Sequence, residues 1–345
     1  MTEERFITST LQRQDEDFEQ TLRPQSFEDF PGQEDKKAQL EISVLAAKQR
    51  GEALGHLLLS GPPGLGKTTL AHIVANEMGK NIKTSSGPVI EKPADLAGLL
   101  SSLEYGDILF IDEIHRLSTN VEEYLYSAME DYYIDIILDQ GAGSRSIRLD
   151  IPPFTLIGAT TRQGSISAPM RSRFLLDLRL DYYEPAILQK IVSRSGGLLN
   201  VDIYEDASLE VASRSRGTPR IANKLLRWVR DFAQVKADGV ITLPVAKDAL
   251  AMQKIDDEGL DEMDTRLLDT LLFKFNGGPV GIKTLAVALG EEEGTIQEVL
   301  EPFLIQIGYL VHTKQGRVAT DKSWKRFNAQ PKRAENGQPD FFDEL

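Results

Sequence analysis

The 345-residue chain has no cysteine and only four histidines. Without cysteine it can form neither a disulfide nor a thiolate metal site, as is typical of a reducing compartment, so we expect a cytoplasmic protein. The four histidines (His56, His72, His115 and His312) are scattered without the spacing of metal ligands. The sequence therefore predicts no metal site built from cysteine or histidine.

Long hydrophobic runs are also missing. No apolar stretch approaches the roughly 20 residues that a membrane helix needs, and the N-terminus is polar, unlike a signal peptide, so we expect no membrane partner. Basic residues are in the minority, and the formal net charge is −14. This charge argues against a protein that coats nucleic acid with its whole surface, so any DNA contact must come from a local patch.

Residues 61–69 read Gly-Pro-Pro-Gly-Leu-Gly-Lys-Thr-Thr, the full pattern of a phosphate-binding loop, and are called the phosphate loop below. The apolar run 56–60 before it suits a buried strand. Apolar residues at spacings of three and four between 70 and 78 suit one face of a helix. Strand, glycine loop and helix in this order are the context in which the pattern is specific.

The residue types of the phosphate loop fit phosphate chemistry. Gly64 and Gly66 let backbone N–H groups and the helix N-terminus point at phosphate oxygens. Lys67 is expected to reach the terminal phosphates and the hydroxyl of Thr68 to ligate Mg²⁺, while Thr69 completes the pattern. The chain is therefore predicted to bind a nucleoside triphosphate, with Mg²⁺ as its only metal.

A second apolar run, residues 107–113, ends in two carboxylates. A strand that ends at Asp112 would place this carboxylate beside the Mg²⁺ held by Thr68. Glu113 could then polarise the attacking water as a general base. A protein that only binds nucleotide has no use for Glu113, so the pair predicts hydrolysis.

Hydrophobic patterning divides the chain into three blocks. Residues 1–182 alternate short apolar runs with helical patterns, which predicts an α/β domain with a parallel sheet and helices on both faces. Helical spacing alone predicts a small helical domain over 183–255. Residues 256–328 hold helical segments and then a hairpin, typical of a winged helix, and 329–345 has too few apolar residues to order itself.

Three local patterns add detail. Thr295 followed by Glu298 has the spacing of a capping box and predicts a helix start, and Gln315-Gly316 predicts the turn of the last hairpin. Residues 133–151 have two apolar arms around a Gly-rich turn, which predicts a hairpin inserted into the first domain. An apolar hairpin outside the core sheet is expected to be a docking surface. The alternative is that both arms pair into the main sheet.

Six motifs recur in the same order in one family. They are Leu22-Arg23-Pro24, the phosphate loop, and residues 112–117, 129–132, 158–162 and 216–223. On these motifs the chain resembles the RuvB family of AAA+ ATPases, the bacterial motors that drive branch migration of Holliday junctions in recombination and DNA repair. The resemblance covers residues 22–327. It implies ATP and Mg²⁺ as cofactors, an AAA+ domain followed by a helical lid and a winged helix, and a homohexamer around duplex DNA. It also implies RuvA on four-way junctions as partner, and the RuvC resolvase in a larger complex.

The resemblance assigns further catalytic roles. Thr161 matches the polar sensor beside the γ-phosphate, and Arg220 matches the second sensor, which reports that phosphate to the lid. Arg173 matches the arginine finger that reaches the neighbouring subunit's nucleotide, with Arg171 as the competing candidate. The positions that match those around adenine and ribose are Leu22, Arg23, Glu130, Asp131, Tyr132 and Tyr183. For Tyr183 a role as a core aromatic is the alternative. In the hairpin, Ile136, Ile137 and Leu138 match the grip on RuvA.

The DNA-binding end departs from the family. Residues 312–333 contain seven basic residues against one acid, which indicates either a phosphate-binding patch or a solvated face. His312 and Gln315 stand where the family wing has arginines, Arg317 is kept, and Lys314 is the expected compensating charge. Leu175-Leu176 replaces the Gly-Ile that is usual in the family.

Two classes of function follow from these patterns. The first is a hexameric ATP-driven DNA motor, with a clamp-loader-like AAA+ ATPase as a near relative. The second is an ATP-switched regulator whose winged helix reads a DNA sequence. The full hydrolytic set (Glu113, Thr161, Arg173 and Arg220) and the inserted hairpin favour the motor.

Overall fold

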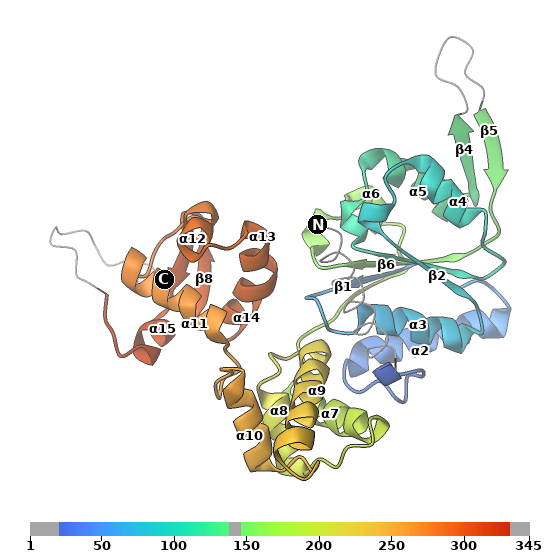
Figure 1. The fold of residues 1–345 in the computed structure, drawn as a ribbon. Coiled ribbons are helices and arrows are strands. Elements are labelled where there is room, and N and C mark those ends of the chain that lie inside the picture. The colour runs from blue at the N-terminus through green and yellow to red at the C-terminus, as the bar shows by residue number, and fades with distance from the viewer. Residues whose placement is uncertain (1–20, 138–145, 332–345) are drawn as a thin grey trace, which may run out of the picture. The chain divides into compact units, whose positions relative to one another are not determined.

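The computed structural model describes residues 21–137 and 146–331. The chain divides after Ala246 into two compact units, and each unit is described by itself (Figure 1). Among the described residues, none of the helices combines the length and the apolar character that a membrane crossing requires.

The first unit contains a parallel five-stranded sheet in the order β2-β3-β6-β1-β7. The strands are β1 (Leu57–Ser60), β2 (Ile82–Ser86), β3 (Ile108–Asp112), β6 (Thr155–Thr160) and β7 (Leu176–Arg179). All residues of the central strands β1 and β6 are buried, which explains their unbroken apolar sequences, because a parallel sheet is covered on both faces. The predicted α/β fold with a parallel sheet is confirmed.

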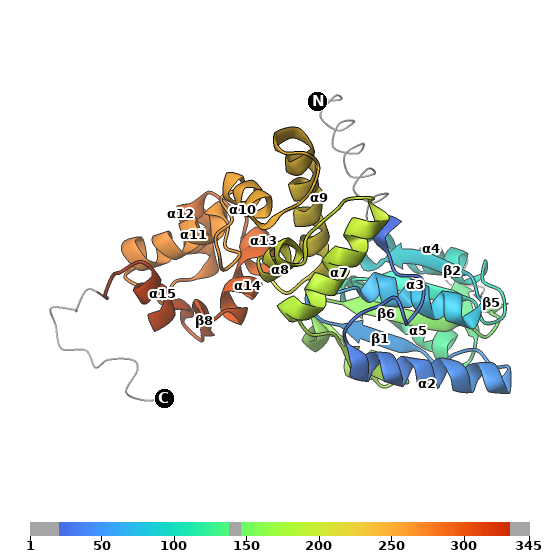
Figure 2. The same ribbon diagram turned by 90° about the horizontal axis from the view of Figure 1, so that it is seen from below.

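Helices cover both faces of this sheet (Figures 1 and 2). The helices α2 (Glu34–Arg50) and α3 (Lys67–Met78) lie on one face. On the other face α4 (Pro93–Leu100), α5 (Thr119–Glu130) and the short α6 (Ala168–Arg171) pack into a single core with the strands. Three 3₁₀ turns connect these elements: Gly87–Val89, Ile114–Arg116 and Gln163–Ser165.

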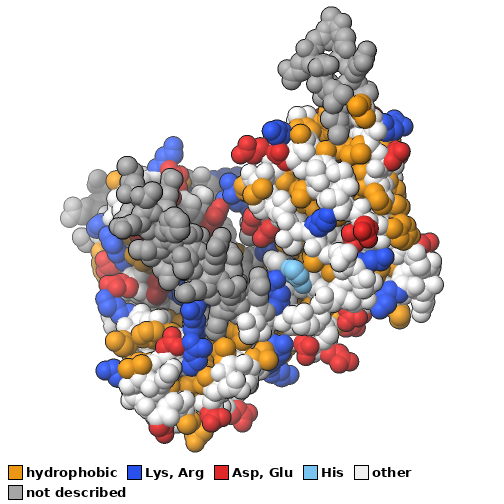
Figure 3. All heavy atoms as spheres, turned by 45° about the vertical axis from the view of Figure 1, so that its right-hand side comes forward, with side chains coloured by type: hydrophobic (Ala, Val, Ile, Leu, Met, Phe, Trp, Pro, Cys, Tyr) orange, Lys and Arg blue, Asp and Glu red, His pale blue; other side chains and the backbone are white. Residues whose placement is uncertain are grey.

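The inserted hairpin is confirmed as a separate element. Strands β4 (Tyr133–Ile137) and β5 (Ser146–Asp150) pair antiparallel in a sheet of their own, so the alternative of pairing into the main sheet is wrong. Ile134 anchors the hairpin in the domain core, whereas Ile147 is exposed. Figure 3 shows hydrophobic side chains gathered at the base of the hairpin. The backbone of Ile136 and Ile137 lies in β4, and Leu138 lies outside the described residues.

The lid is helical, as predicted. Its helices are α7 (Pro185–Leu198), α8 (Glu205–Ser213), α9 (Pro219–Lys236) and α10 (Leu243–Met252), the last of which extends into the second unit. Both α7 and α9 begin with proline, and the Thr218 hydroxyl accepts a hydrogen bond from Ile221 N–H at the start of α9. The apolar stripe of α9, with Leu225, Leu226 and Val229, is buried.

The second unit is a winged helix around one apolar core. Its elements are α11 (Glu262–Asp269), a π-helical turn (Thr270–Lys274), α12 (Ile282–Leu289), α13 (Glu293–Thr295), a second π-helical turn (Ile296–Leu300), α14 (Glu301–Gln306), β8 (Leu310–Thr313), β9 (Gly316–Ala319) and α15 (Asp321–Arg326). Strands β8 and β9 form the antiparallel wing. Of the predicted disordered tail, residues 329–331 are described and 332–345 lie outside the described residues.

The predicted capping box is wrong. Thr295 has helical backbone angles, φ −59° and ψ −44°, and lies inside the helical stretch rather than at its start. The stretch begins at Glu293, after Glu292 in an extended conformation. Acidic side chains at this N-terminus favour the earlier start, because they interact well with the positive end of the helix dipole. The turn of the wing is also shifted, since Gly316 is the first residue of β9.

Candidate nucleotide-binding site

The phosphate loop connects β1 to α3 at the carboxyl end of the sheet. Gly61 and Gly66 have φ values of 135° and 98°, in the region that favours glycine. A Cβ atom at Gly61 would lie 2.5 Å from the Leu180 carbonyl oxygen, so no side chain fits there. Lys67, Thr68 and Thr69 form the first turn of α3, whose N-terminus is a ready site for an anion.

Lys67 is held over the phosphate loop. Its Nζ donates hydrogen bonds to the carbonyl oxygens of Gly61 (2.8 Å) and Pro62 (2.9 Å), and its side chain is buried. Burial lowers the pKa of Lys67, and the carboxylates of Asp112 and Glu113 act in the opposite direction. The two carboxylates at the end of β3 therefore lie close enough to the Lys67 ammonium group to stabilise its charged form.

Glu113 and Thr161 meet at the carboxyl ends of β3 and β6. The Thr161 hydroxyl donates a hydrogen bond to Glu113 Oε2 at 3.1 Å. His115 Nδ1 lies 3.2 Å from the same oxygen and 2.9 Å from the Thr160 hydroxyl. Asp112 accepts a hydrogen bond from the Glu113 N–H at 2.9 Å. His115 was not predicted as a site residue, although it lies within the recurring motif 112–117.

The lid contacts the phosphate loop through Arg220. The Arg220 N–H donates to the Gly64 carbonyl at 3.4 Å, and a Cβ atom at Gly64 would lie 3.0 Å from that of Arg220. The positive charge of Arg220 also contributes to the lowered pKa of Lys67. This places the predicted second sensor beside the loop at the start of α9.

Three other residues were predicted to contact the nucleotide: Tyr183, Leu22 and Arg23. The Tyr183 hydroxyl donates to the Leu65 carbonyl at 3.3 Å, its ring is buried, and this burial raises its pKa. Tyr183 also lines a cavity of about 260 Å³ between residues 32–36 and 181–187. Leu22 is buried with its carbonyl bound to Arg194. Burial lowers the pKa of His72, and the positive charge of the nearby Arg23 lowers it further.

Arg173 lies at the opposite edge of the sheet. Its guanidinium contacts Glu130 (2.9 Å) and the Pro169 carbonyl (2.6 Å) and lies 4.4 Å from the centre of the Tyr126 ring. The adjacent Met129 carbonyl is 3.1 Å from His56, which directly precedes β1. The phosphate loop follows the other end of this four-residue strand, about 13 Å away at 3.3 Å per residue.

This position bears on another group of predicted nucleotide contacts. Glu130, Asp131 and Tyr132 follow Met129, so within one subunit the length of β1 separates them from the phosphate loop. The motif 129–132 predicts nucleotide contacts, but it does not indicate at which end of the sheet these residues lie. A cavity of about 480 Å³ lies on this side, lined by residues 53–56, Met129, Tyr132 and residues 172–175.

The competing arginine and the unusual leucine lie nearby. Arg171 contacts Asp177 at 2.6 Å and is half exposed. Leu175 is 62% exposed, and its side chain covers Gly55, where a Cβ atom would lie 2.6 Å from it. The absence of a side chain at position 55 thus accommodates Leu175, but nothing in the structure gives Leu175 a function.

The buried His56 is expected to make the free energy of unfolding depend on pH. Leu156 N–H donates to His56 Nδ1 (2.9 Å), so the ring proton is on Nε2, facing the Met129 carbonyl. Burial lowers the pKa of His56. Since the folded-state pKa lies below the unfolded value of about 6.5, the unfolded state takes up the proton first. This contribution is complete above that pH and is lost as the pH falls toward the folded-state pKa.

We therefore expect the melting temperature to fall between pH 7 and pH 5, and to fall less in a His56→Gln variant. The expected difference is about 1.4 kcal/mol for each unit by which the pKa is depressed. His72, whose pKa burial also lowers, keeps its share in both proteins. Thermal unfolding at matched ionic strength measures this, and parallel pH profiles of parent and variant would contradict it.

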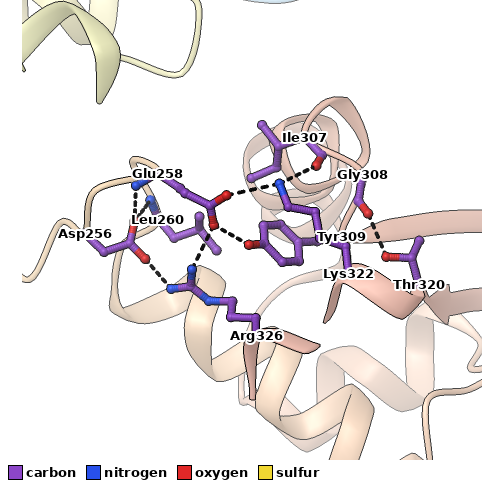
Figure 4. Close-up of polar contacts among 9 residues, drawn as sticks. All are labelled: Asp256, Glu258, Leu260, Ile307, Gly308, Tyr309, Thr320, Lys322 and Arg326. Atoms are coloured by element: carbon purple, nitrogen blue, oxygen red, sulfur yellow. Dashed lines mark hydrogen bonds and ion pairs between the residues drawn. The ribbon is translucent and has the colours of Figure 1, made fainter. Parts of the chain in front are cut away.

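Three of the five described basic residues of the predicted patch form internal ion pairs. Lys322 contacts Glu258 at 3.1 Å, and Arg326 reaches both Glu258 and Asp256 (Figure 4). These pairs, and a hydrogen bond from the Tyr309 hydroxyl to Glu258, hold the acidic joint 256–258 against α15. Burial raises the pKa of Glu258, but Tyr309, Lys322 and Arg326 outweigh this effect, so that its pKa is lowered. A charge count along the sequence does not reveal these internal pairs. Of its seven basic residues, Lys332 and Arg333 lie outside the described residues.

The predicted DNA contacts lie on the wing. Lys314 is exposed in the turn between β8 and β9. Arg317 and His312 instead contact the carboxylate of Glu301 on α14. No sequence pattern predicted this role of Glu301, because it is one of several acidic residues in the same helical stretch.

Three family models match consecutive parts of the chain. They describe the P-loop domain of the Holliday junction DNA helicase RuvB (residues 22–180), the RuvB AAA lid domain (183–256) and the RuvB C-terminal winged helix domain (257–328). The chain is similar to the Holliday junction branch migration complex subunit RuvB of Salinibacter ruber, with 58% identity over 98% of this chain and 97% of that protein. The corresponding subunit of Chlorobaculum parvum is 59% identical over 90% and 91% of the two chains. Among solved structures, the Thermotoga maritima RuvB branch migration motor matches with a TM-score of 0.82 and 49% identity, covering 90% of this chain and 99% of that one.

Proposed function

The chain belongs to the RuvB family, and from that premise we propose that it is an ATP-hydrolysing motor that drives branch migration of Holliday junctions. The observation that carries the proposal is the contact of Glu113 with Thr161 beside the ammonium of Lys67. A general base, a polar sensor and a phosphate-binding lysine at one edge of a sheet suit hydrolysis rather than binding alone.

The residues present fit ATP with Mg²⁺. In the described residues no group of three or more His, Cys, Asp or Glu side chains could hold a metal. Mg²⁺ that arrives with phosphates needs only one or two protein oxygens, which the Thr68 hydroxyl and the Asp112 carboxylate would supply. When bound, the ion would offset charge on the phosphates. Lys67 would exchange its two carbonyl partners for phosphate oxygens, and Glu113 would orient a water and accept its proton.

The second part of the proposal is a homohexameric ring. Arg173 and residues 130–132 lie at the end of β1 away from their own phosphate loop, a position that suits contact with the nucleotide of a neighbouring subunit. Arg173 would then neutralise charge on the transferred phosphoryl group across the subunit boundary. The β4–β5 hairpin would contact RuvA, and duplex DNA would pass through the ring. RuvC would join the larger complex.

The alternative function, an ATP-switched regulator that reads a DNA sequence, is disfavoured by the composition of one helix. This is the helix that a winged helix domain commonly places on DNA. Residues 291–306 contain no lysine or arginine but five glutamates, and all of these except Glu301 are at least partly exposed. Such a surface repels the phosphate backbone and offers no basic side chain to read guanine. Sequence-specific binding through this helix is therefore not expected.

ATP turnover measured with different DNAs tests the proposal. We expect a four-way junction together with RuvA to stimulate turnover at least several-fold more than a linear duplex of equal length, because the junction loads the ring. The control is the junction with RuvA omitted. Stimulation by one particular duplex sequence, and not by the junction, would instead support the regulator.

A further inference from the structure

Glu301 is a buried carboxylate that contacts both Arg317 and His312 on the strands of the wing. Its side chain is 3% exposed. Oε1 lies 2.7 Å from Arg317 Nε, and Oε2 lies 3.3 Å from Arg317 Nη2 and 2.9 Å from His312 Nε2. The fork of the guanidinium therefore meets both carboxylate oxygens, the geometry of a strong charge-assisted pair.

The strand register explains why both side chains reach the same acid. His312 in β8 lies directly opposite Arg317 in β9, so the two share one face of the hairpin. The backbone of Arg317 is fixed as well, because it exchanges two hydrogen bonds of 2.9 Å with Val280. As a result the Arg317 side chain is only 12% exposed, although it belongs to a surface strand.

This arrangement sets up a competition. A phosphate that approaches Arg317 meets a guanidinium with its Nε–H and one Nη2–H already donated to Glu301. It also meets the negative charge of Glu301 itself. Lys314, by contrast, is exposed at the wing tip and has no ion-pair partner among the described residues.

We propose that Glu301 tunes DNA affinity: as the counter-ion of Arg317 it competes with duplex phosphates and keeps the grip of each wing weak, so that Lys314 supplies the main phosphate contact. The inference rests on the proposed function, in which the wings track a duplex. A motor that moves along DNA must release each phosphate it contacts, and a built-in competitor lowers the affinity that release has to overcome.

The test is duplex binding by the full chain with ATP, measured across a salt series. Glu301→Gln keeps the size and a hydrogen-bond acceptor but removes the charge. We expect it to bind duplex about threefold to tenfold more tightly at low salt, with a salt slope steeper by up to about 0.9 per subunit that gains a contact. Glu293→Gln removes the same charge at an exposed position of the same helical stretch and is the matched control.

Double variants show whether Glu301 acts through Arg317. In an Arg317→Ala background, Glu301→Gln should add no more than Glu293→Gln does. Single substitutions give a second, independent measure if Glu301→Gln fails to fold: Lys314→Ala should weaken binding more, and flatten the salt slope more, than Arg317→Ala. Glu301→Asp, which keeps the charge, should bind duplex like the parent.

Two results overturn the inference alone. In one, the parent binds duplex and Glu301→Gln weakens that binding as much as Arg317→Ala, so that Glu301 orients Arg317 for phosphate. In the other, Glu301→Gln is indistinguishable from Glu293→Gln. If the parent with ATP binds no duplex at all, the proposed function fails, and this inference fails with it.

Discussion

Replacement of Glu113 by glutamine is expected to stop ATP turnover and leave ATP binding intact. Glutamine cannot accept a proton from the attacking water, although it fits the same space and can still accept the Thr161 hydrogen bond. Lys67 and Thr68, which would hold the phosphates and Mg²⁺, are unchanged. Loss of a general base costs about 10²–10⁴-fold in rate, so we expect kcat to fall by that factor with an ATP Kd within about twofold of the parent.

Phosphate release and equilibrium nucleotide binding, measured on the same preparation, separate the two effects. Glu91→Gln, which removes the same charge at an exposed position before α4, serves as the control and should hydrolyse ATP at the parental rate. If Glu113→Gln hydrolysed ATP within a few-fold of the parent, the general-base assignment would be wrong. His115, which shares the carboxylate, would then be the next residue to vary.

Loss of the Arg173 side chain should have the second large effect. Arg173→Ala is expected to bind ATP normally and to hydrolyse it about 10³–10⁵-fold more slowly, the size of arginine-finger effects in related phosphoryl transfer. ATP binding should persist because Arg173 lies beyond the far end of β1 from its own phosphate loop. To act in a neighbour, its guanidinium must leave Glu130, whose side chain is 55% exposed, and also the Pro169 carbonyl and the Tyr126 ring.

Mixed rings test whether Arg173 acts across the subunit boundary. Arg173→Ala and Lys67→Ala are each expected to be inactive alone, but in a mixture some interfaces combine an intact phosphate loop with an intact finger. Activity should therefore reappear and peak at intermediate mixing ratios. Arg171→Ala is the matched control, since Arg171 contacts Asp177 of its own subunit. If mixed rings form without any recovery, the trans role of Arg173 is contradicted and Arg171 becomes the candidate.

Much of the site was predictable because its signals are local. The phosphate loop lies between a buried strand and a helix, and its glycines, lysine and threonine are the residue types that phosphate binding requires at these spacings. Asp112 and Glu113 follow the next apolar run in the same way. Parallel strands bring such carboxyl ends to one edge of the sheet, which explains why Glu113 and Thr161 meet although 48 residues separate them.

The remaining features depend on contacts that no local pattern encodes. Arg173 and Glu130 meet because α5 runs back along the sheet and ends where β1 begins. The pairs of Arg326 with Asp256 and Glu258 join residues that are 70 and 68 positions apart. In the wing, Arg317 was predicted to contact DNA because it keeps an arginine of the family wing. Only the packing of α14 against the wing shows that its guanidinium is held by Glu301.

The most direct test of the motor is branch migration itself. A synthetic four-way junction with homologous arms, incubated with RuvA, ATP and the parent protein, should be converted to duplex products at a rate that follows ATP turnover. Glu113→Gln, which would bind ATP without hydrolysing it, should leave the junction intact. If the parent hydrolyses ATP on the junction and yields no duplex products, or if Glu113→Gln resolves the junction as fast as the parent, the account of an ATP-driven motor is contradicted.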